Sequence, residues 1–243
     1  MKLYNADCLD ILKSLPDKSV DLVVTDPPYL IGTEGGLNTS GSAMNNHLVH
    51  LKDSNIHEGY DIDVINTELV RVMKNINIYI FCNKAQILDY FNFYVVKLGC
   101  LFDILILHKA NVSPLFSCRY LDDFEYCLYF HKGGYGVKPE CYADASKYYN
   151  FVHNASEKAR YGHPTIKPLP FIERVIRNSS RPGDVVLDPY MGSGTTGVAC
   201  KDLGRDFIGV EISEQWYKVA KQRIEEENAT VDNAIALDFS QLI

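Results

Sequence analysis

Residues 25–29 read Thr-Asp-Pro-Pro-Tyr and follow a run of apolar residues. Asp26 supplies a carboxylate, and Pro27 and Pro28 have a fixed φ and no N–H, so their carbonyls are rigidly aimed. Tyr29 offers a flat face for stacking. These groups suit a planar ring with an exocyclic amine, because two acceptors would localise the lone pair of its nitrogen for attack on an electrophilic methyl group. The plainer alternative is a proline-rich turn after a strand.

A second polar stretch, Asp-Pro-Tyr-Met-Gly-Ser-Gly-Thr-Thr, covers residues 188–196. Gly192, Gly194 and Gly197 complete the pattern G-x-G-x-x-G, and the absence of a following lysine disfavours a triphosphate loop. Glu211 ends the next apolar run about 20 residues later, where an acid suits the two hydroxyls of a ribose. The pattern is compatible with a nicotinamide dinucleotide, with S-adenosylmethionine, or with a tight strand–helix turn alone.

Alternating apolar runs and helix-period segments predict an α/β fold with a mostly parallel sheet covered on both faces. The segments 101–108 and 124–131 have no helix between them, so we expect them to pair antiparallel at an edge. Ligands of such sheets bind at the carboxyl ends of the strands, where both polar stretches stand. The expected strands are 3–5, 20–24, 77–82, 101–108, 124–131, 184–188 and 206–211, and the expected helices are about 8–14, 61–75, 84–98, 168–179, 194–203 and 213–228.

Composition and charge narrow the class of protein. The 243 residues are 47% hydrophobic, which is ample for a core, and no apolar run is long enough for a membrane helix. Seven cysteines without a C-x-x-C pair favour reduced thiols in a cytoplasmic protein over structural zinc. The net charge is −7, but residues 101–167 hold 8 basic and 7 acidic residues, so a polyanion contact is best sought there.

Three motifs together resemble a known family. "TDPPY" (25–29), "HPTIKP" (163–168) and "DPYMGSGTT" (188–196) are similar to motifs of the amino-methyltransferases that act on exocyclic amines of DNA bases. The catalytic motif precedes the glycine motif, and this permuted order resembles the β group of that family. The resemblance implies a Rossmann-like S-adenosylmethionine-dependent methyltransferase fold, with a seven-stranded mostly parallel sheet and an antiparallel edge hairpin.

The resemblance also implies roles for individual residues. Asp26, Pro27, Pro28 and Tyr29 would hold the target base. The residues that would surround the S-adenosylmethionine cofactor are Asp7, Cys8, His163, Thr165, Lys167, Asp188, Tyr190, Gly192, Ser193, Gly194, Thr195, Thr196 and Glu211. The chain departs from the family pattern at Ile166, where glutamine is common, at Tyr190, where phenylalanine is usual, and at Leu30, where asparagine is frequent.

The chain is expected to form a single catalytic domain, 1–243, with target-recognition loops at about 31–60 and 109–162. Polar residues that could contact DNA phosphates or base edges include Lys109, Asn111, Arg119, Lys132 and Lys138. The mechanism requires no metal, and the loop histidines His47, His50 and His57 are expected to be solvated. Double-stranded DNA is the expected partner; a homodimer and a companion restriction endonuclease are both compatible with the family.

Several alternatives stay open at this stage. Asp-Pro-Pro-Tyr is more often associated with adenine N6 and Ser-Pro-Pro-Tyr with cytosine N4, so adenine is favoured and cytosine N4 is the first alternative. Methylation of RNA or of a protein glutamine usually has the glycine motif first. A dinucleotide-dependent oxidoreductase would leave 26–29 without a role. A catalytically silent DNA-binding or decoy protein on the same fold is the alternative outside enzymes.

Overall fold

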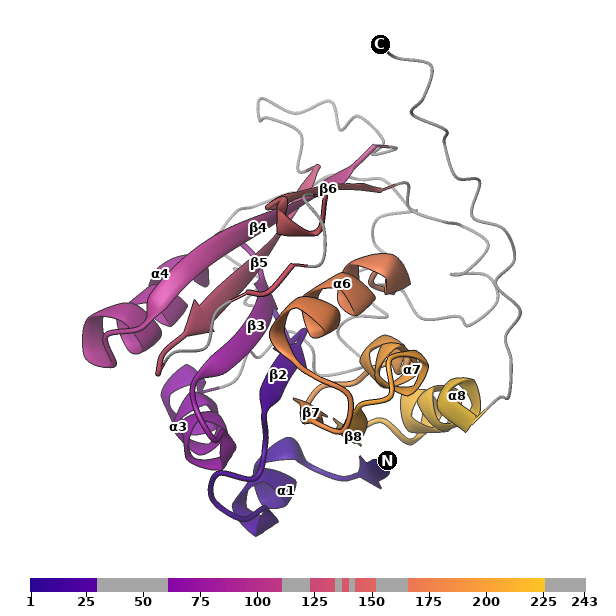
Figure 1. The fold of residues 1–243 in the computed structure, drawn as a ribbon. Helices are drawn as coiled ribbons and strands as arrows, with labels where there is room; N and C mark the ends of the chain where they lie inside the picture. Colours follow the sequence, from indigo (N-terminus) through magenta and orange to yellow (C-terminus); the bar gives the residue numbers. More distant parts are fainter. Residues whose placement is uncertain (30–60, 111–122, 134–136, 140–142, 152–165, 226–243) are drawn as a thin grey trace, which may run out of the picture.

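The computed structural model describes residues 1–29, 61–110, 123–133, 137–139, 143–151 and 166–225. Its centre is an eight-stranded sheet with the order β1-β8-β7-β2-β3-β5-β4-β6 (Figure 1). The strands are β1 (Lys2–Asn5), β2 (Leu22–Thr25), β3 (Asn77–Cys82), β4 (Leu101–Lys109), β5 (Phe124–His131), β6 (Tyr148–Phe151), β7 (Val185–Asp188) and β8 (Asp206–Glu211).

Only β5 runs against its neighbours among these strands, since it pairs antiparallel with both β3 and β4. The other pairs are parallel, as the alternation of apolar runs and helices predicts. The predicted antiparallel pairing of 101–108 with 124–131 is therefore confirmed. The outermost strand, however, is β6, which pairs parallel with β4.

The prediction of seven strands was wrong by one, because β6 lies inside the expected loop at 109–162. Two side chains explain why this short segment adopts a strand. Tyr149 and Phe151 alternate onto one face of the sheet, where they pack against a buried apolar cluster, and the Tyr149 ring meets Phe171 edge to face at 5.3 Å. The expected loop at 31–60 lies outside the described residues.

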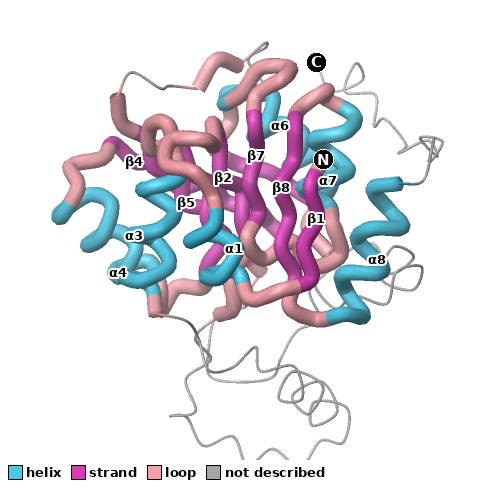
Figure 2. Tube along the Cα trace, turned by 90° about the horizontal axis from the view of Figure 1, so that it is seen from below, coloured by secondary structure: helices cyan, strands magenta, loops and turns pink. Residues whose placement is uncertain are grey.

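Helices cover both faces of the sheet. They form two groups, one on each side of the sheet (Figure 2). Leu12, Leu69 and Tyr90 belong to one buried cluster, and Phe171, Ala199 and Ile224 belong to the other. The first group of helices is α1 (Cys8–Ser14), α3 (Ile62–Val72), α4 (Ile87–Phe91) and the π-helix η1 (Asn92–Lys97); the second is α6 (Leu169–Ser179), α7 (Thr195–Asp202) and α8 (Glu214–Glu225). No described helix is long and apolar enough to cross a membrane.

The glycine stretch shapes the junction between β7 and α7. Gly194, the residue before α7, has a φ of +83°, which a side chain would strain. Gly197 has another role: a Cβ there would lie 2.3 Å from Cδ1 of Ile224 and 2.8 Å from the Phe207 ring. The third glycine of the pattern therefore lets α7 approach α8 and β8 closely, which tightens the scaffold beneath the site.

Candidate active site

The two polar stretches of the sequence meet at one edge of the sheet. β2 and β7 are parallel neighbours, with Val23 opposite Leu187, so Asp26 and Asp188 leave the sheet at adjacent carboxyl ends. β1 and β8 end at the same edge, with Asn5 opposite Glu211. The topology therefore gathers the predicted catalytic and cofactor residues at the carboxyl ends of four neighbouring strands.

The catalytic stretch is held by two hydrogen bonds from side chains. The Tyr29 hydroxyl donates to Oδ1 of Asp26 at 2.8 Å. Nε2 of the buried Gln86 donates to the Pro28 carbonyl at 3.1 Å, and the Gln86 backbone N–H is itself fixed by Asn83. Burial, together with the neighbouring Asp26 charge, raises the pKa of Tyr29 well above its ordinary value, so its hydroxyl remains a donor.

Lys167 lies against the catalytic carboxylate. Its Nζ is 2.9 Å from Oδ2 of Asp26, 3.2 Å from Oε2 of Glu125 and 3.2 Å from the Tyr29 hydroxyl, and its side chain is only 9% exposed. Burial alone would lower the pKa of Lys167, but the charges of Asp26 and Glu125 outweigh it and raise that pKa well above the ordinary value. The resemblance assigned Lys167 to the cofactor pocket, whereas the structure sets its ammonium group beside Asp26.

Glu125, at the start of β5, joins two lysines. Oε1 is 2.7 Å from Lys109 Nζ, and Oε2 faces Lys167. Burial would raise the pKa of the Glu125 carboxyl, but the two ammonium groups outweigh burial and lower it to about 2. Glu125 and Gln86 are the site residues that the sequence reading missed. The signal for Glu125 was an acid inside the apolar strand "FEYCLYFH".

Two acids lie on the other side of the site: Asp188, which is buried, and Glu211, which is half-buried. Oδ1 of Asp188 accepts from the Tyr190 N–H at 3.1 Å, and Oδ2 accepts from the Thr196 hydroxyl at 2.7 Å. Oε2 of Glu211 accepts from the Gly192 N–H at 3.0 Å, and Oε1 accepts from the Ser213 N–H at 2.8 Å. Burial raises the pKa of both acids, that of Asp188 to about 7.

Three other predicted cofactor residues lie nearby. Asp7 ends the turn after β1 and caps α1 by accepting from the Leu9 N–H at 2.8 Å. The Cys8 thiol, whose pKa is raised by burial, contacts Tyr190. Ser193 is held by Arg223 of α8, which donates to both the carbonyl and the hydroxyl of Ser193. The predicted cofactor residues His163 and Thr165 lie outside the described residues.

The acid set fits a cofactor that carries an ammonium group and hydroxyls. Asp188 is 4% exposed, yet neither it nor Glu211 forms an ion pair within the described part of the chain. Buried carboxylates bound only by N–H and hydroxyl groups keep lone pairs for a ligand. This is the chemistry that the amino acid and ribose parts of S-adenosylmethionine require.

The predicted DNA contacts do not form one surface. Lys109 is the last residue of β4, at the same end of the strands as the candidate site. Its ammonium group forms an ion pair with Glu125, and the Lys109 side chain is 20% exposed. Lys132 donates to the Leu98 carbonyl, and Lys138 lies beside the C-terminal end of α6. Both lie near the opposite ends of the strands, because the antiparallel β5 carries the chain away from the site, and their contact with DNA stays a prediction. Asn111 and Arg119 lie outside the described residues.

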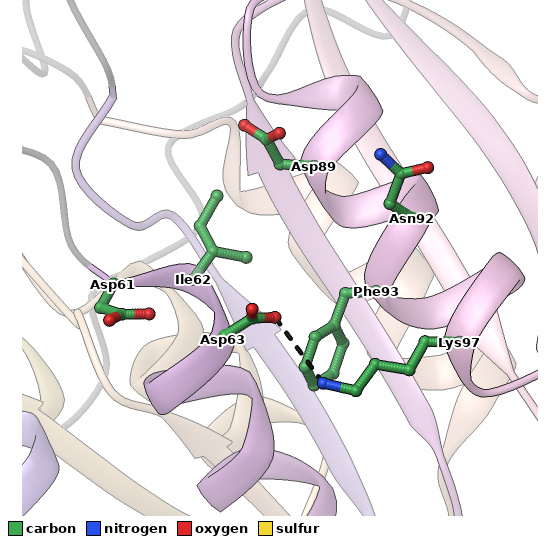
Figure 3. A pocket seen from close by; sticks show the side chains of 7 residues that line it. All are labelled: Asp61, Ile62, Asp63, Asp89, Asn92, Phe93 and Lys97. Atoms are coloured by element: carbon green, nitrogen blue, oxygen red, sulfur yellow. Dashed lines mark ion pairs between the residues drawn. The ribbon is translucent and has the colours of Figure 1, made fainter.

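A surface hollow of about 450 Å³ lies elsewhere, between the start of α3 and the helices α4 and η1 (Figure 3). Its rim carries three aspartates, Asp61, Asp63 and Asp89, and Lys97 reaches Asp63 at 3.9 Å. None of the residues placed in the site lines it. Its acids would repel a nucleic acid, so we assign the chemistry to the strand ends instead.

Comparisons with known proteins agree with this geometry. A family model for DNA methylases of the N6/N4 type matches residues 20–222. The type II methyltransferase M2.DpnII of Streptococcus pneumoniae is 29% identical over an alignment that covers 95% of this chain and 91% of that protein. M.HinfI of Haemophilus influenzae, also a type II methyltransferase, is 30% identical, with 92% of this chain and 68% of the relative covered.

Two solved structures of DNA methyltransferases share the fold of this chain. The complex of M1.HpyAVI with S-adenosylmethionine is 28% identical, has a TM-score of 0.65 and covers 93% of this chain and 99% of that one. The cytosine-N4-specific PvuII DNA methyltransferase, at 16% identity and a TM-score of 0.68, shares the fold over 94% of this chain and 87% of that one. With a family model that matches residues 20–222, and with M2.DpnII aligned over 95% of this chain and 91% of its own length, the chain belongs to the N6/N4 DNA methylase family.

Proposed function

We propose that this protein is a site-specific DNA methyltransferase that moves a methyl group from S-adenosylmethionine to the N6 amine of adenine in duplex DNA. The observation that carries the proposal is the meeting of the Asp26–Tyr29 acceptor group with the acids Asp188 and Glu211 at the carboxyl ends of neighbouring strands. The M1.HpyAVI complex, a relative with 28% identity, supports the choice of cofactor.

The cofactor site is assigned to the ends of β1, β7 and β8. Asp188 would accept hydrogen bonds from the ammonium group of the methionine part, and Glu211 would accept them from the ribose hydroxyls. Asp7 and Cys8 would contact the adenine. When bound, the cofactor supplies an electrophilic methyl group on a sulfonium.

The target base is assigned to the end of β2. A base inside a duplex cannot reach this edge, so the nucleotide must flip out at a cost of a few kcal/mol. Tyr29 would stack on the flipped ring. We assign the two amine hydrogens to the Asp26 carboxylate and the Pro27 carbonyl, while Gln86 holds the Pro28 carbonyl in place. Each Asp26 oxygen has one partner, Tyr29 or Lys167, and keeps a lone pair for an amine hydrogen.

In the proposed reaction the amine nitrogen would attack the methyl group that the cofactor supplies, and the carbon–sulfur bond would break, leaving its electron pair on sulfur, as the carbon–nitrogen bond forms. The nitrogen then carries a positive charge that Asp26 stabilises, and one N–H proton leaves along the hydrogen bond to that carboxylate. Adenine is proposed over cytosine because the motif begins with Asp26, and Asp-Pro-Pro-Tyr goes more often with adenine N6 in this family.

The test is an incubation with methyl-labelled S-adenosylmethionine and unmethylated duplex DNA, followed by nucleoside analysis of the digest. We expect labelled N6-methyladenine, and mapping of the labelled positions would give the recognition sequence. Label on cytosine N4 would overturn the base assignment and keep the mechanism. An Asp26→Ala protein should retain cofactor binding and lose at least about 100-fold in rate, and full activity of that variant would refute the role of Asp26.

A further inference from the structure

The cluster of charged side chains around Asp26 contains Glu125, a residue to which the proposed function gives no role. Lys167 is shared between two carboxylates, Asp26 at 2.9 Å and Glu125 at 3.2 Å. Glu125 is 15% exposed, and its second oxygen pairs with Lys109, which is the more exposed of the two lysines. The order of charges from the target site outward is therefore negative, positive, negative, positive.

That order matters for the reaction, because the proposed target amine gains positive charge as the methyl group arrives. Asp26 alone would stabilise this charge, but the ammonium group of Lys167 beside it opposes the effect. Glu125 holds a compensating negative charge directly behind Lys167. The three innermost groups then sum to −1, whereas without Glu125 the sum would be zero.

We infer that Glu125 is a positioning residue for methyl transfer: it anchors and neutralises Lys167, so that the field of Asp26 at the target amine stays negative. This inference rests on the proposed function. It assigns to Glu125 an effect on the transition state, through Lys167, and no contact with the base or the cofactor.

A merely structural role for Glu125 predicts a different outcome. If Glu125 only filled space, the isosteric glutamine would replace it well and the shorter aspartate would leave a gap. Glutamine offers one acceptor oxygen to the two lysines, so the melting temperature reports the contact that it loses. If its charge acts on the reaction, aspartate should serve and glutamine should fail. The two readings thus predict opposite rankings for the same pair of substitutions.

The experiment compares Glu125→Gln and Glu125→Asp with the unmodified protein in single-turnover methyl transfer to the mapped DNA site, at saturating cofactor and DNA. Dissociation constants for S-adenosylmethionine and for the DNA, and the melting temperature, are measured for each protein. Asp21→Asn is the matched control: Asp21 is a buried carboxylate paired with Lys74 at 2.8 Å and located at the opposite end of β2. It should lower the melting temperature and leave the rate unchanged.

We expect Glu125→Gln to lower the single-turnover rate about 10- to 100-fold, the size of a unit charge acting over several ångströms, with both dissociation constants nearly unchanged. Glu125→Asp should stay within about fivefold of the unmodified protein. A glutamine variant as fast as the aspartate variant would overturn the inference.

Should the glutamine protein not fold, the double variant Glu125→Gln with Lys109→Met takes its place under the same criterion, because it removes one of the two ammonium groups that the single glutamine oxygen cannot serve. Failure of the inference is distinct from failure of the proposed function. In the first case the unmodified protein labels DNA and the charge at position 125 has no effect on the rate. In the second case the unmodified protein puts no label on adenine in DNA at all.

Discussion

Replacement of Asp188 by asparagine should stabilise the folded protein at neutral and alkaline pH while it removes a cofactor contact. Asp188 is 4% exposed and has no cationic partner among the described residues, and burial raises its pKa from 3.8 to about 7. The folded state therefore binds this proton more tightly than the unfolded state does. Between the two pKa values the stability contributed by Asp188 falls as the pH rises, and the loss is complete above about pH 7.

The size of the effect follows from the same shift. From pH 5 to the folded-state pKa of about 7 is roughly two pH units, and at about 1.36 kcal/mol per unit the ionisation of Asp188 costs about 2.7 kcal/mol over that window. Asparagine cannot ionise; its amide oxygen can still accept from the Tyr190 N–H, and its NH2 group can donate to the Thr196 hydroxyl oxygen, which then turns its own hydrogen away. The Asp188→Asn protein should thus gain about 2.7 kcal/mol on the unmodified protein between pH 5 and pH 8.

The assay is urea denaturation of both proteins at pH 5 and pH 8 without cofactor. Asp206→Asn, at an exposed acid that begins the strand after α7, reports any general effect of losing a carboxylate. The reasoning would be refuted if the unmodified protein and Asp188→Asn differed in stability by the same amount at both pH values. That result would mean that Asp188 ionises as easily in the folded chain as in the unfolded one.

Three further predictions concern the same edge of the sheet. Because ionised Asp188 is the form that attracts an ammonium group, the affinity for S-adenosylmethionine should fall up to about tenfold per pH unit below about pH 7, as measured by titration calorimetry. Gly197→Ala should destabilise the protein by about 1–3 kcal/mol in urea denaturation, since its Cβ would overlap Ile224; an unchanged midpoint would contradict the packing. Gln86→Leu should slow single-turnover transfer about tenfold and leave the affinity for the cofactor intact, because the Pro28 carbonyl loses its donor. An equal loss in transfer rate and in cofactor affinity would contradict this role and indicate general damage.

Much of the scaffold could be predicted from the sequence, because hydrophobic period and turn residues are local signals. The helix expected at 8–14 is α1, and the strands expected at 77–82 and 124–131 are β3 and β5. The strand β6 could not be found this way. Its four residues carry no pattern longer than one alternation, and its extended form depends on pairing with the edge of β4.

The contacts within the site likewise could not all be predicted from local sequence patterns. The motifs locate Asp26 and Asp188 because each follows its own strand. By contrast, the partners of Lys167 are Asp26 and Glu125, which are far from it in the sequence, and only the sheet order brings them together. Likewise, the charge count grouped Lys132 with residues at the active edge, although the antiparallel course of β5 carries it toward the opposite ends of the strands.

The acids in the two halves of the site have different partners, and the difference suits their proposed ligands. Asp188 and Glu211 are bound by N–H and hydroxyl donors, so they keep their attraction for a ligand that is already cationic when it binds. Asp26 is instead paired with Lys167, which suits an amine that is neutral when it arrives and becomes positive only during the reaction. Pairing with Lys167 fixes the Asp26 carboxylate where that amine arrives, and the negative charge of Glu125 behind the lysine keeps the field at the amine negative as methyl transfer proceeds.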